Sequence, residues 1–510
     1  MSTNSRESAP SDPRGTSTDG APPIESGDLA KVMGPGLLLL FIVGDILGTG
    51  VYALTGTIAG EIGGAAWAPI LLAFFVATVT AFSYLEMVTK YPGASGAALY
   101  THKAFGIGLL TFMVTFAVLA SGLTSASTAA RTVASNLVAG FGWEDPPITA
   151  VTLMAVGFMF LLMIINLRSV KESLMLNVVL TCIELSGLAI VILIGLWAVT
   201  QGNADFSRTM IFETPEDKSL FLVLTSVTSL AFFSFVGFED SVNMVEETKD
   251  PQRTFPRIML IGLCITGAVY VLVSILAVAV VPIGVLGEST TPLLEVVNAG
   301  APGIPIGAIY PFLTIFAVAN TALINMLMAS RLLYGMAAQG VLPGFLSKVS
   351  TKHSVPWASV VFTTLLAAAL ILVVGQLMAK ETAAALGGTT ALLLLGVFAV
   401  VNVSVIVLRR DRSREGTGYF RAPTFIPFVG AATTLFLIGP WAQDPIEYQI
   451  AAVLLGIGLL LSALNWAYKR FVKHEPMGFE DTQAIAHLGE EPHGHDIRGE
   501  HRSTHDRPQR

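Results

Sequence analysis

The sequence is poor in charged residues and in cysteine. Of its 510 residues, 13% are charged and 53% are hydrophobic, which leaves too few polar groups to cover the surface of a soluble protein. The two cysteines, Cys182 and Cys264, exclude a disulfide framework, and because both lie in apolar segments we expect them to be buried. The composition therefore predicts an integral membrane protein.

Further absences exclude classes of function. The sequence has no Gly-rich phosphate-binding loop of the ATPase type, and its apolar segments carry no histidine, which argues against an ATP-driven pump and a membrane metalloenzyme. The net charge is -7 and no basic face is present, so nucleic acid is not an expected partner. We predict no enzyme, cofactor or metal site, and expect as partners the lipid bilayer, a small-molecule substrate and a proton or another ion.

Long apolar runs recur through the chain, each close to the roughly 20 residues that a helix needs to cross a bilayer. They predict an all-α protein with twelve transmembrane helices, at 36–59, 66–88, 109–138, 147–166, 175–200, 220–244, 256–281, 303–335, 356–378, 384–408, 424–441 and 447–470.

Lys and Arg are unevenly distributed between the loops. One alternate set of loops and adjoining span ends is rich in them, whereas the opposite set holds Arg131, which lies inside the predicted span 109–138, and Arg208, Lys218 and Lys380. Because basic loops stay in the cytoplasm, we expect a multi-pass protein of the cell membrane with both termini cytoplasmic. The polar segments 1–33 and 474–510 are expected to be disordered tails.

Glycines interrupt the first predicted span, at Gly48-Thr49-Gly50, close to Asp45. A broken helix there would expose N–H groups that attract a carboxylate. The alternative is that the glycines only permit close helix packing. An acid such as Asp45 is costly within a span and normally marks a transport pathway, so it favours the functional interpretation.

The sixth predicted span is interrupted in the same way, at Gly237-Phe238-Glu239. It lies five spans after the first, as expected if two five-helix repeats of inverted topology bring their broken first helices together. We therefore predict one repeat at 34–200 and a second at 201–408, followed by two extra helices at 409–473.

Four segments resemble the amino acid-polyamine-organocation superfamily, particularly its cationic amino acid transporter-like branch. They are Gly44–Gly56, Tyr91–Tyr100, Gly237–Glu239 with Glu246–Arg253, and Asn320–Leu323 with Ser330–Tyr334. The resemblance implies that a substrate carboxylate meets the N–H groups of Gly48, Thr49 and Gly50. Its amine would meet carbonyl groups near Asp45, Ile46 and Phe235, and Phe238, beside Gly237, would close over it as a gate.

Three acids are candidates for coupling transport to a proton or ion. Glu239 resembles a position suspected of carrying a proton in the superfamily, although it could instead cap the broken helix. Glu184 stands where the branch often has a lysine that replaces a bound sodium, and Asp45 stands where relatives often have a small residue. Both departures put the family's coupling scheme in doubt and open the possibility of a cation site.

The sequence thus predicts a secondary active transporter that moves an amino acid by alternating access, driven by protons or by exchange. Two alternatives stay open: a transporter of polyamines such as putrescine, and a nutrient-sensing receptor that binds its ligand without transporting it.

Overall fold

A computed structural model describes residues 33–92, 96–143, 145–168, 173–214, 218–303, 305–338, 340–350, 355–378, 381–411 and 418–473. Within these ranges the chain is helical, with no strand and two isolated β-bridges. The predicted tails, apart from Met33, and residues 93–95 of the Tyr91–Tyr100 motif lie outside the described residues.

Eleven helical segments of the described chain are long and apolar enough to cross a membrane, so the prediction of an all-α, multi-pass membrane protein is confirmed. Two of these segments are interrupted and consist of several helical pieces. The elements that form the eleven segments are α1 (Pro35–Ile46) with α2 (Thr49–Ile62), α3 (Trp67–Lys90), α5 (Gly108–Gly140), α6 (Ile148–Asn166), α7 (Ser173–Thr200), α8 (Leu220–Phe232) with η2 (Phe233–Phe235) and the start of η3 (Asp240–Glu247), α9 (Pro251–Val280), α12 (Tyr310–Ala338), α13 (Trp357–Met378), α14 (Thr382–Leu408) and α16 (Pro445–Tyr468) with the start of η7 (Lys469–Lys473).

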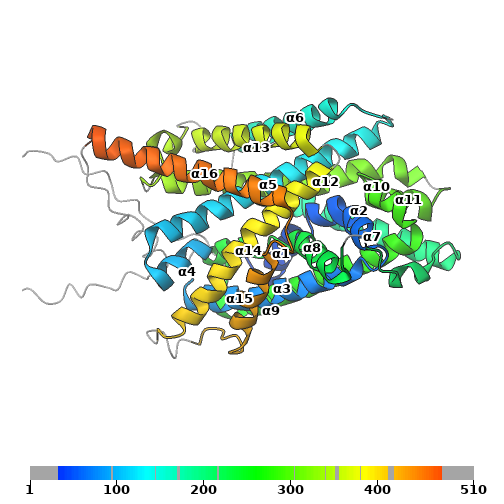
Figure 1. The fold of residues 1–510 in the computed structure, drawn as a ribbon, viewed down its shortest axis with the longest axis horizontal. Helices are drawn as coiled ribbons and strands as arrows, with labels where there is room; N and C mark the ends of the chain where they lie inside the picture. The colour runs from blue at the N-terminus through cyan, green and yellow to red at the C-terminus, as the bar shows by residue number, and fades with distance from the viewer. Residues whose placement is uncertain are drawn as a thin grey trace, which may run out of the picture.

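The remaining elements are shorter. The predicted span at 424–441 is α15 (Ile426–Leu437), whose 12 residues correspond to a length of about 18 Å. Short helices also cap the two ends of the molecule, with α10 and α11 at one end and α4 at the other (Figure 1). The bounds of these helices and of the short 3-10 turns are α4 (Gly96–Phe105), α10 (Ile283–Glu288), α11 (Pro292–Gly300), η1 (Phe206–Met210), η4 (Pro305–Ala308) and η5 (Gly344–Ser347).

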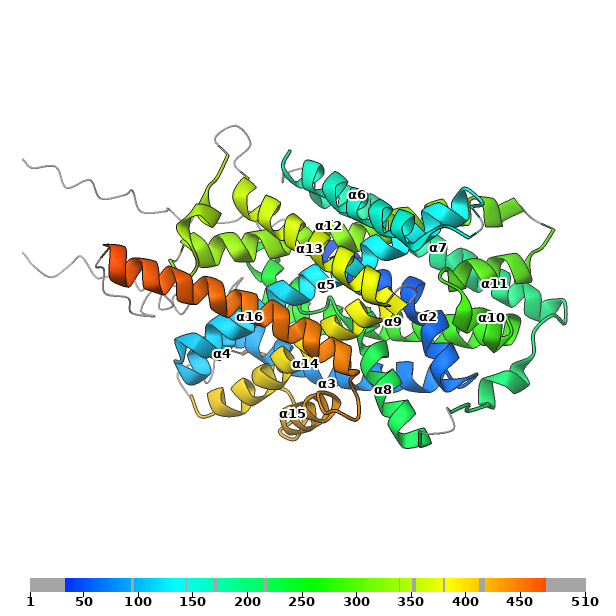
Figure 2. The same ribbon diagram turned by 45° about the horizontal axis from the view of Figure 1, so that its top comes forward.

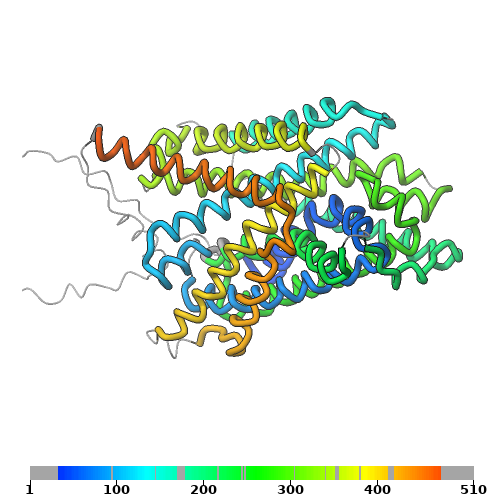
Figure 3. The backbone as a smooth tube through the Cα atoms, in the orientation of Figure 1, coloured from blue at the N-terminus to red at the C-terminus, as the bar shows by residue number. Residues whose placement is uncertain are grey.

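The two interrupted spans occupy the middle of the molecule. Figure 3 shows the chain of α1 and α2 bending near the centre, next to the green tube of α8. The other long helices surround them, and α6 and α13 run side by side along one edge in both views of the ribbon (Figures 1 and 2). Both predicted breaks are therefore present and close together.

Contacts between the helices follow the symmetry that the predicted repeat requires. α5 packs against α14 as α12 packs against α7, and α1 packs against α9 as α8 packs against α3. When spans one to five are matched in order with spans six to ten, the first contact of each of these two comparisons corresponds to the second. This pattern supports the two-repeat interpretation, while the domain boundaries at 200 and 408 stay a prediction.

A buried ion pair ties the end of α14 to α3. Arg409 donates from Nε and Nη2 to the two carboxylate oxygens of Glu86, at 2.8 and 2.6 Å. The Ala422 N–H donates to the same carboxylate at 2.9 Å, and the Ala422 carbonyl accepts from Arg409. Hydrogen bonding to Glu86 raises the pKa of Arg409 above its ordinary value. The pair fixes the loop before α15 against the bundle.

The expectation of buried cysteines is wrong. Cys182 and Cys264 are both exposed on the outer surface of the helix bundle. In a bilayer the outward face of a spanning helix is apolar like its inward face, so apolar neighbours in the sequence do not show which way a side chain points.

Candidate functional site

The first break lies between α1 and α2. α1 ends at Ile46 and α2 begins at Thr49, so the first N–H groups of α2 have no preceding carbonyl of their own helix to donate to. Gly48 lies close to α12, since a methyl group placed on it would be 2.3 Å from Oγ1 of Thr321. On the other side, Tyr270 donates its hydroxyl hydrogen to the Ile46 carbonyl at 2.5 Å. Neighbouring helices thus hold the broken backbone in place.

The second break follows α8. After the short turn η2, Val236 is extended and Gly237 has φ +123°, a conformation that glycine adopts without the steric cost of a Cβ atom. A Cβ atom on Gly237 would also lie 2.9 Å from the carbonyl oxygen of Asp45. Gly237 therefore serves both the turn and the close approach of the two breaks.

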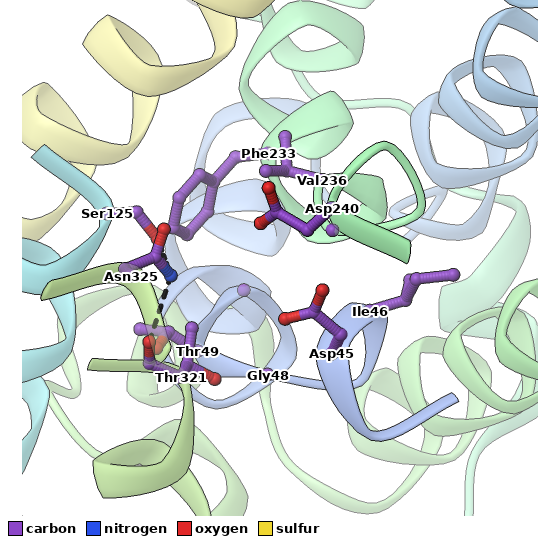
Figure 4. Close-up of a pocket in the computed structure, with 12 residues that line it drawn as sticks. Asp45, Ile46, Gly48, Thr49, Ser125, Phe233, Val236, Asp240, Thr321 and Asn325 are labelled. Carbon is purple, nitrogen blue, oxygen red and sulfur yellow. Dashed lines mark hydrogen bonds between the residues drawn. The ribbon is translucent and has the colours of Figure 1, made fainter. Parts of the chain in front are cut away.

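A small cavity opens where the two breaks meet. The acids Asp45 and Asp240 direct their carboxylates into it, as Figure 4 shows. On the opposite wall, Asn325 donates to the Thr321 carbonyl at 2.9 Å and to the Ser125 hydroxyl at 3.3 Å. The complete lining is Asp45, Ile46, Gly48, Thr49, Gly50, Ser125, Phe233, Val236, Gly237, Asp240, Thr321 and Asn325. We call this space the central cavity.

Several buried polar atoms of the central cavity lack a partner. Among the described residues, Oδ2 of Asp45, Oγ1 of Thr49 and Oγ1 of Thr321 make no hydrogen bond. Buried polar atoms in proteins are nearly always hydrogen-bonded, so a cluster of exceptions indicates a place where a ligand or water completes the set. The cavity combines these groups with the helix-start N–H groups of α2.

Most of the predicted substrate residues line the central cavity. Asp45, Ile46, Gly48, Thr49, Gly50 and Gly237 all do so. Phe235 instead packs against Tyr270, with ring centroids 5.3 Å apart. Phe238, the predicted gate, is fully buried against Tyr84 and Phe398, at 5.7 and 5.3 Å. Its closing role stays a prediction.

Glu239 faces a second cavity that adjoins the first. Val236, Asp240 and Asn325 line both spaces, and Glu239 lines only the second. Its Oε2 accepts the Gly237 N–H at 2.9 Å. This bond is the one expected if Glu239 caps the broken backbone, which is the structural alternative to a proton-carrying role.

Glu184 lies on α7, behind the first break. Its side chain is fully buried, and neither carboxylate oxygen has a hydrogen-bond partner among the described residues. Its backbone carbonyl accepts the Tyr52 hydroxyl at 3.0 Å, so α2 holds this turn of α7 in place. The acid is one helix away from the central cavity and does not line it.

Sequence reasoning missed the wall opposite the acids. Thr321 and Asn325 are four residues apart on α12 and share one face of it. Their polar side chains in an apolar span were a usable signal, since such residues normally face the bundle interior. Ser125 on α5 gave no such signal because α5 is rich in serine and threonine throughout.

Comparisons with known proteins agree with this arrangement. The family model described as amino acid permease matches residues 37–459. The chain is 27% identical to the methylthioribose transporter of Bacillus subtilis (strain 168), over 79% of this chain and 86% of that protein. It is 26% identical to the branched-chain amino acid permease BcaP of the same organism, over 80% and 88%. It is 30% identical to the vacuolar cationic amino acid transporter 4 of Arabidopsis thaliana, over 65% of this chain and 57% of that longer protein.

Proposed function

Because the chain belongs to the amino acid permease family, we propose that it carries an amino acid across the membrane by alternating access, with the substrate bound in the central cavity. The observation that supports this most is the meeting of two broken helices at Asp45 and Gly237, around buried polar atoms without partners. Discontinuous spans of this kind hold the substrate site in many transporters.

The groups that line the cavity suit the two charged ends of an amino acid, and the cavity, with a volume of about 20 Å³ in this conformation, has to widen to admit one. The substrate carboxylate binds the N–H groups at the start of α2, near Thr49 and Gly50, where the helix dipole favours negative charge. The ammonium group binds between the carboxylates of Asp45 and Asp240, which point into the same space (Figure 4). Ser125, Thr321 and Asn325 form the wall that contacts the substrate side chain.

A substrate with a second positive charge is the other candidate. Asp45, Asp240 and Glu239 line the two adjoining cavities, and no Lys, Arg or His is among the described lining residues. One ammonium group neutralises one carboxylate, so the remaining acids need a proton or a further cationic group. This excess favours a cationic amino acid or a polyamine over a neutral substrate.

For coupling we propose Glu184 together with Asp45. Both carboxylates are buried and have unpartnered oxygens, and neither forms an ion pair with another described residue. A proton or a small cation supplies the missing partner at Glu184, and at Asp45 when no substrate is bound, because the ammonium group of a bound substrate takes that place. Glu239 is the weaker candidate because its carboxylate is already bonded to the Gly237 N–H.

The proposed location is the cell membrane, with both termini in the cytoplasm. The support is the distribution of Lys and Arg between alternate loops. The relatives reported above are transporters, which supports a transporter over an enzyme.

Uptake into proteoliposomes tests the proposal. Purified protein in liposomes loaded with an unlabelled amino acid should take up the same labelled amino acid in a saturable, counterflow-stimulated manner. Competition by arginine, leucine and putrescine then separates the substrate classes. If ligands raise the melting temperature of the protein but no counterflow occurs, the transporter proposal fails and the receptor alternative holds.

A further inference from the structure

A separate cavity lies at the C-terminal end of α16 and shares no lining residue with the central cavity. It has a volume of about 540 Å³ and is lined by the loop after α12 and the last turns of α16. Apolar side chains, including Leu342, Pro343 and Leu464, form much of its wall. The Asn465 amide donates to the Gly340 carbonyl at 2.6 Å and so joins the two walls. We call this space the α16 cavity.

The α16 cavity lies where the membrane surface is expected. α16 is a membrane-spanning helix that ends at Tyr468. Exposed aromatic residues surround this end, namely Phe345, Trp466, Tyr468 and Phe471. Aromatic side chains gather at the level of the lipid headgroups, so the opening faces the boundary between headgroups and acyl chains.

The charge at this boundary is positive. Among the described residues that line the cavity, Lys469 is the only one with a charged side chain. Arg470 follows it directly, and the exposed Lys348 closes the short turn η5, which begins in the cavity wall. A cation beside an apolar wall matches a molecule with an anionic head and a hydrocarbon chain.

We propose that the α16 cavity binds an anionic phospholipid, with its phosphate at Lys469 and an acyl chain along Phe345 and Leu464. The wall formed by residues 340–345 continues from α12, the helix that supplies Thr321 and Asn325 to the central cavity. A bound lipid therefore steadies the end of α12 against α16.

A thermal-stability titration of the delipidated full-length protein in detergent tests the site. Phosphatidylglycerol should raise the melting temperature more than phosphatidylcholine with the same acyl chains. Lys469→Ala should weaken the apparent affinity for phosphatidylglycerol about five-fold, the effect of one lysine near a membrane surface. Leu464→Trp places a larger side chain in the space beside the apolar wall, and it should reduce the rise in melting temperature that phosphatidylglycerol causes.

Arg421→Ala is the matched control, since Arg421 is an exposed cation in a loop that does not line the cavity. It should leave the lipid effect unchanged. Equal shifts with the two lipids, or equal losses in Lys469→Ala and Arg421→Ala, would overturn the proposal. The absence of any phosphatidylglycerol-specific shift in the full-length protein would also overturn the proposal. That result would mean that the protein's own segment 474–510, or nothing, occupies the cavity. None of these readouts measures transport, so they leave the proposed function untouched.

Discussion

Gly48→Ala is the sharpest perturbation of the substrate site. The added methyl group would lie 2.3 Å from Oγ1 and 3.2 Å from Cγ2 of Thr321, so either α12 or the start of α2 has to move. Overpacking of this kind costs roughly 1–3 kcal/mol. If that cost falls on the arrangement that binds substrate, it weakens binding about five- to 150-fold. We expect a raised KM for uptake and a smaller ligand-induced shift in melting temperature.

The control is Gly157→Ala on α6, where an added methyl group meets nothing within 4 Å. It should leave uptake and stability unchanged. Thr321→Ala removes the two nearest atoms of the clash and leaves the Cβ atom at 3.3 Å, so the double variant should take up substrate better than Gly48→Ala alone. A normal KM in Gly48→Ala at unchanged melting temperature would contradict a steric role for Thr321 beside Gly48, and so would strictly additive effects of the two substitutions.

Four substitutions of charged residues test the remaining proposed roles. Glu184→Gln should abolish the pH dependence of uptake while counterflow continues, whereas unchanged pH dependence would remove Glu184 from the coupling step. Glu239→Gln should lower the melting temperature by weakening the hydrogen bond from the Gly237 N–H, but proton-driven uptake should continue. Loss of proton-driven uptake in this variant would make Glu239 the proton carrier after all. Asp240→Asn should weaken competition by arginine and putrescine more than competition by leucine, and equal effects would argue against cation selection. Arg409→Ala should cost roughly 3 kcal/mol of stability by leaving a buried carboxylate unpaired, which a melting curve beside Arg421→Ala would measure.

The long-range architecture could be predicted because few structures satisfy the backbone inside a bilayer. Apolar runs of sufficient length located the spans, and Gly48 and Gly237 marked the two breaks. The breaks were recognisable because glycines next to acids are out of place in a spanning helix. The short length of α15 was not predictable, because the apolar residues on either side of it made the predicted span, 424–441, longer than the helix.

The direction of individual side chains was less accessible. Phe238 was expected to close over the substrate, a role that stays a prediction, and the sequence did not show that its ring packs against Tyr84 and Phe398. A sequence shows that a ring is present near a break but not which neighbours it packs against, because those neighbours come from distant helices. The same limit hid the pairing of Asp45 with Asp240, which depends on how the two breaks cross.

Substrate binding in the central cavity is tested most directly by the protection of Thr49→Cys by substrate in proteoliposomes, in a Cys182→Ser, Cys264→Ser background. Thr49 is 1% exposed and lines the central cavity, and Ser125→Cys provides a second reporter on the opposite wall. A transported amino acid should slow the modification of both cysteines by a thiol reagent, while Ser207→Cys in the η1 turn should react at the same rate with and without substrate. Unchanged modification of Thr49→Cys and Ser125→Cys at saturating substrate, in protein that still transports, would contradict substrate binding in the central cavity.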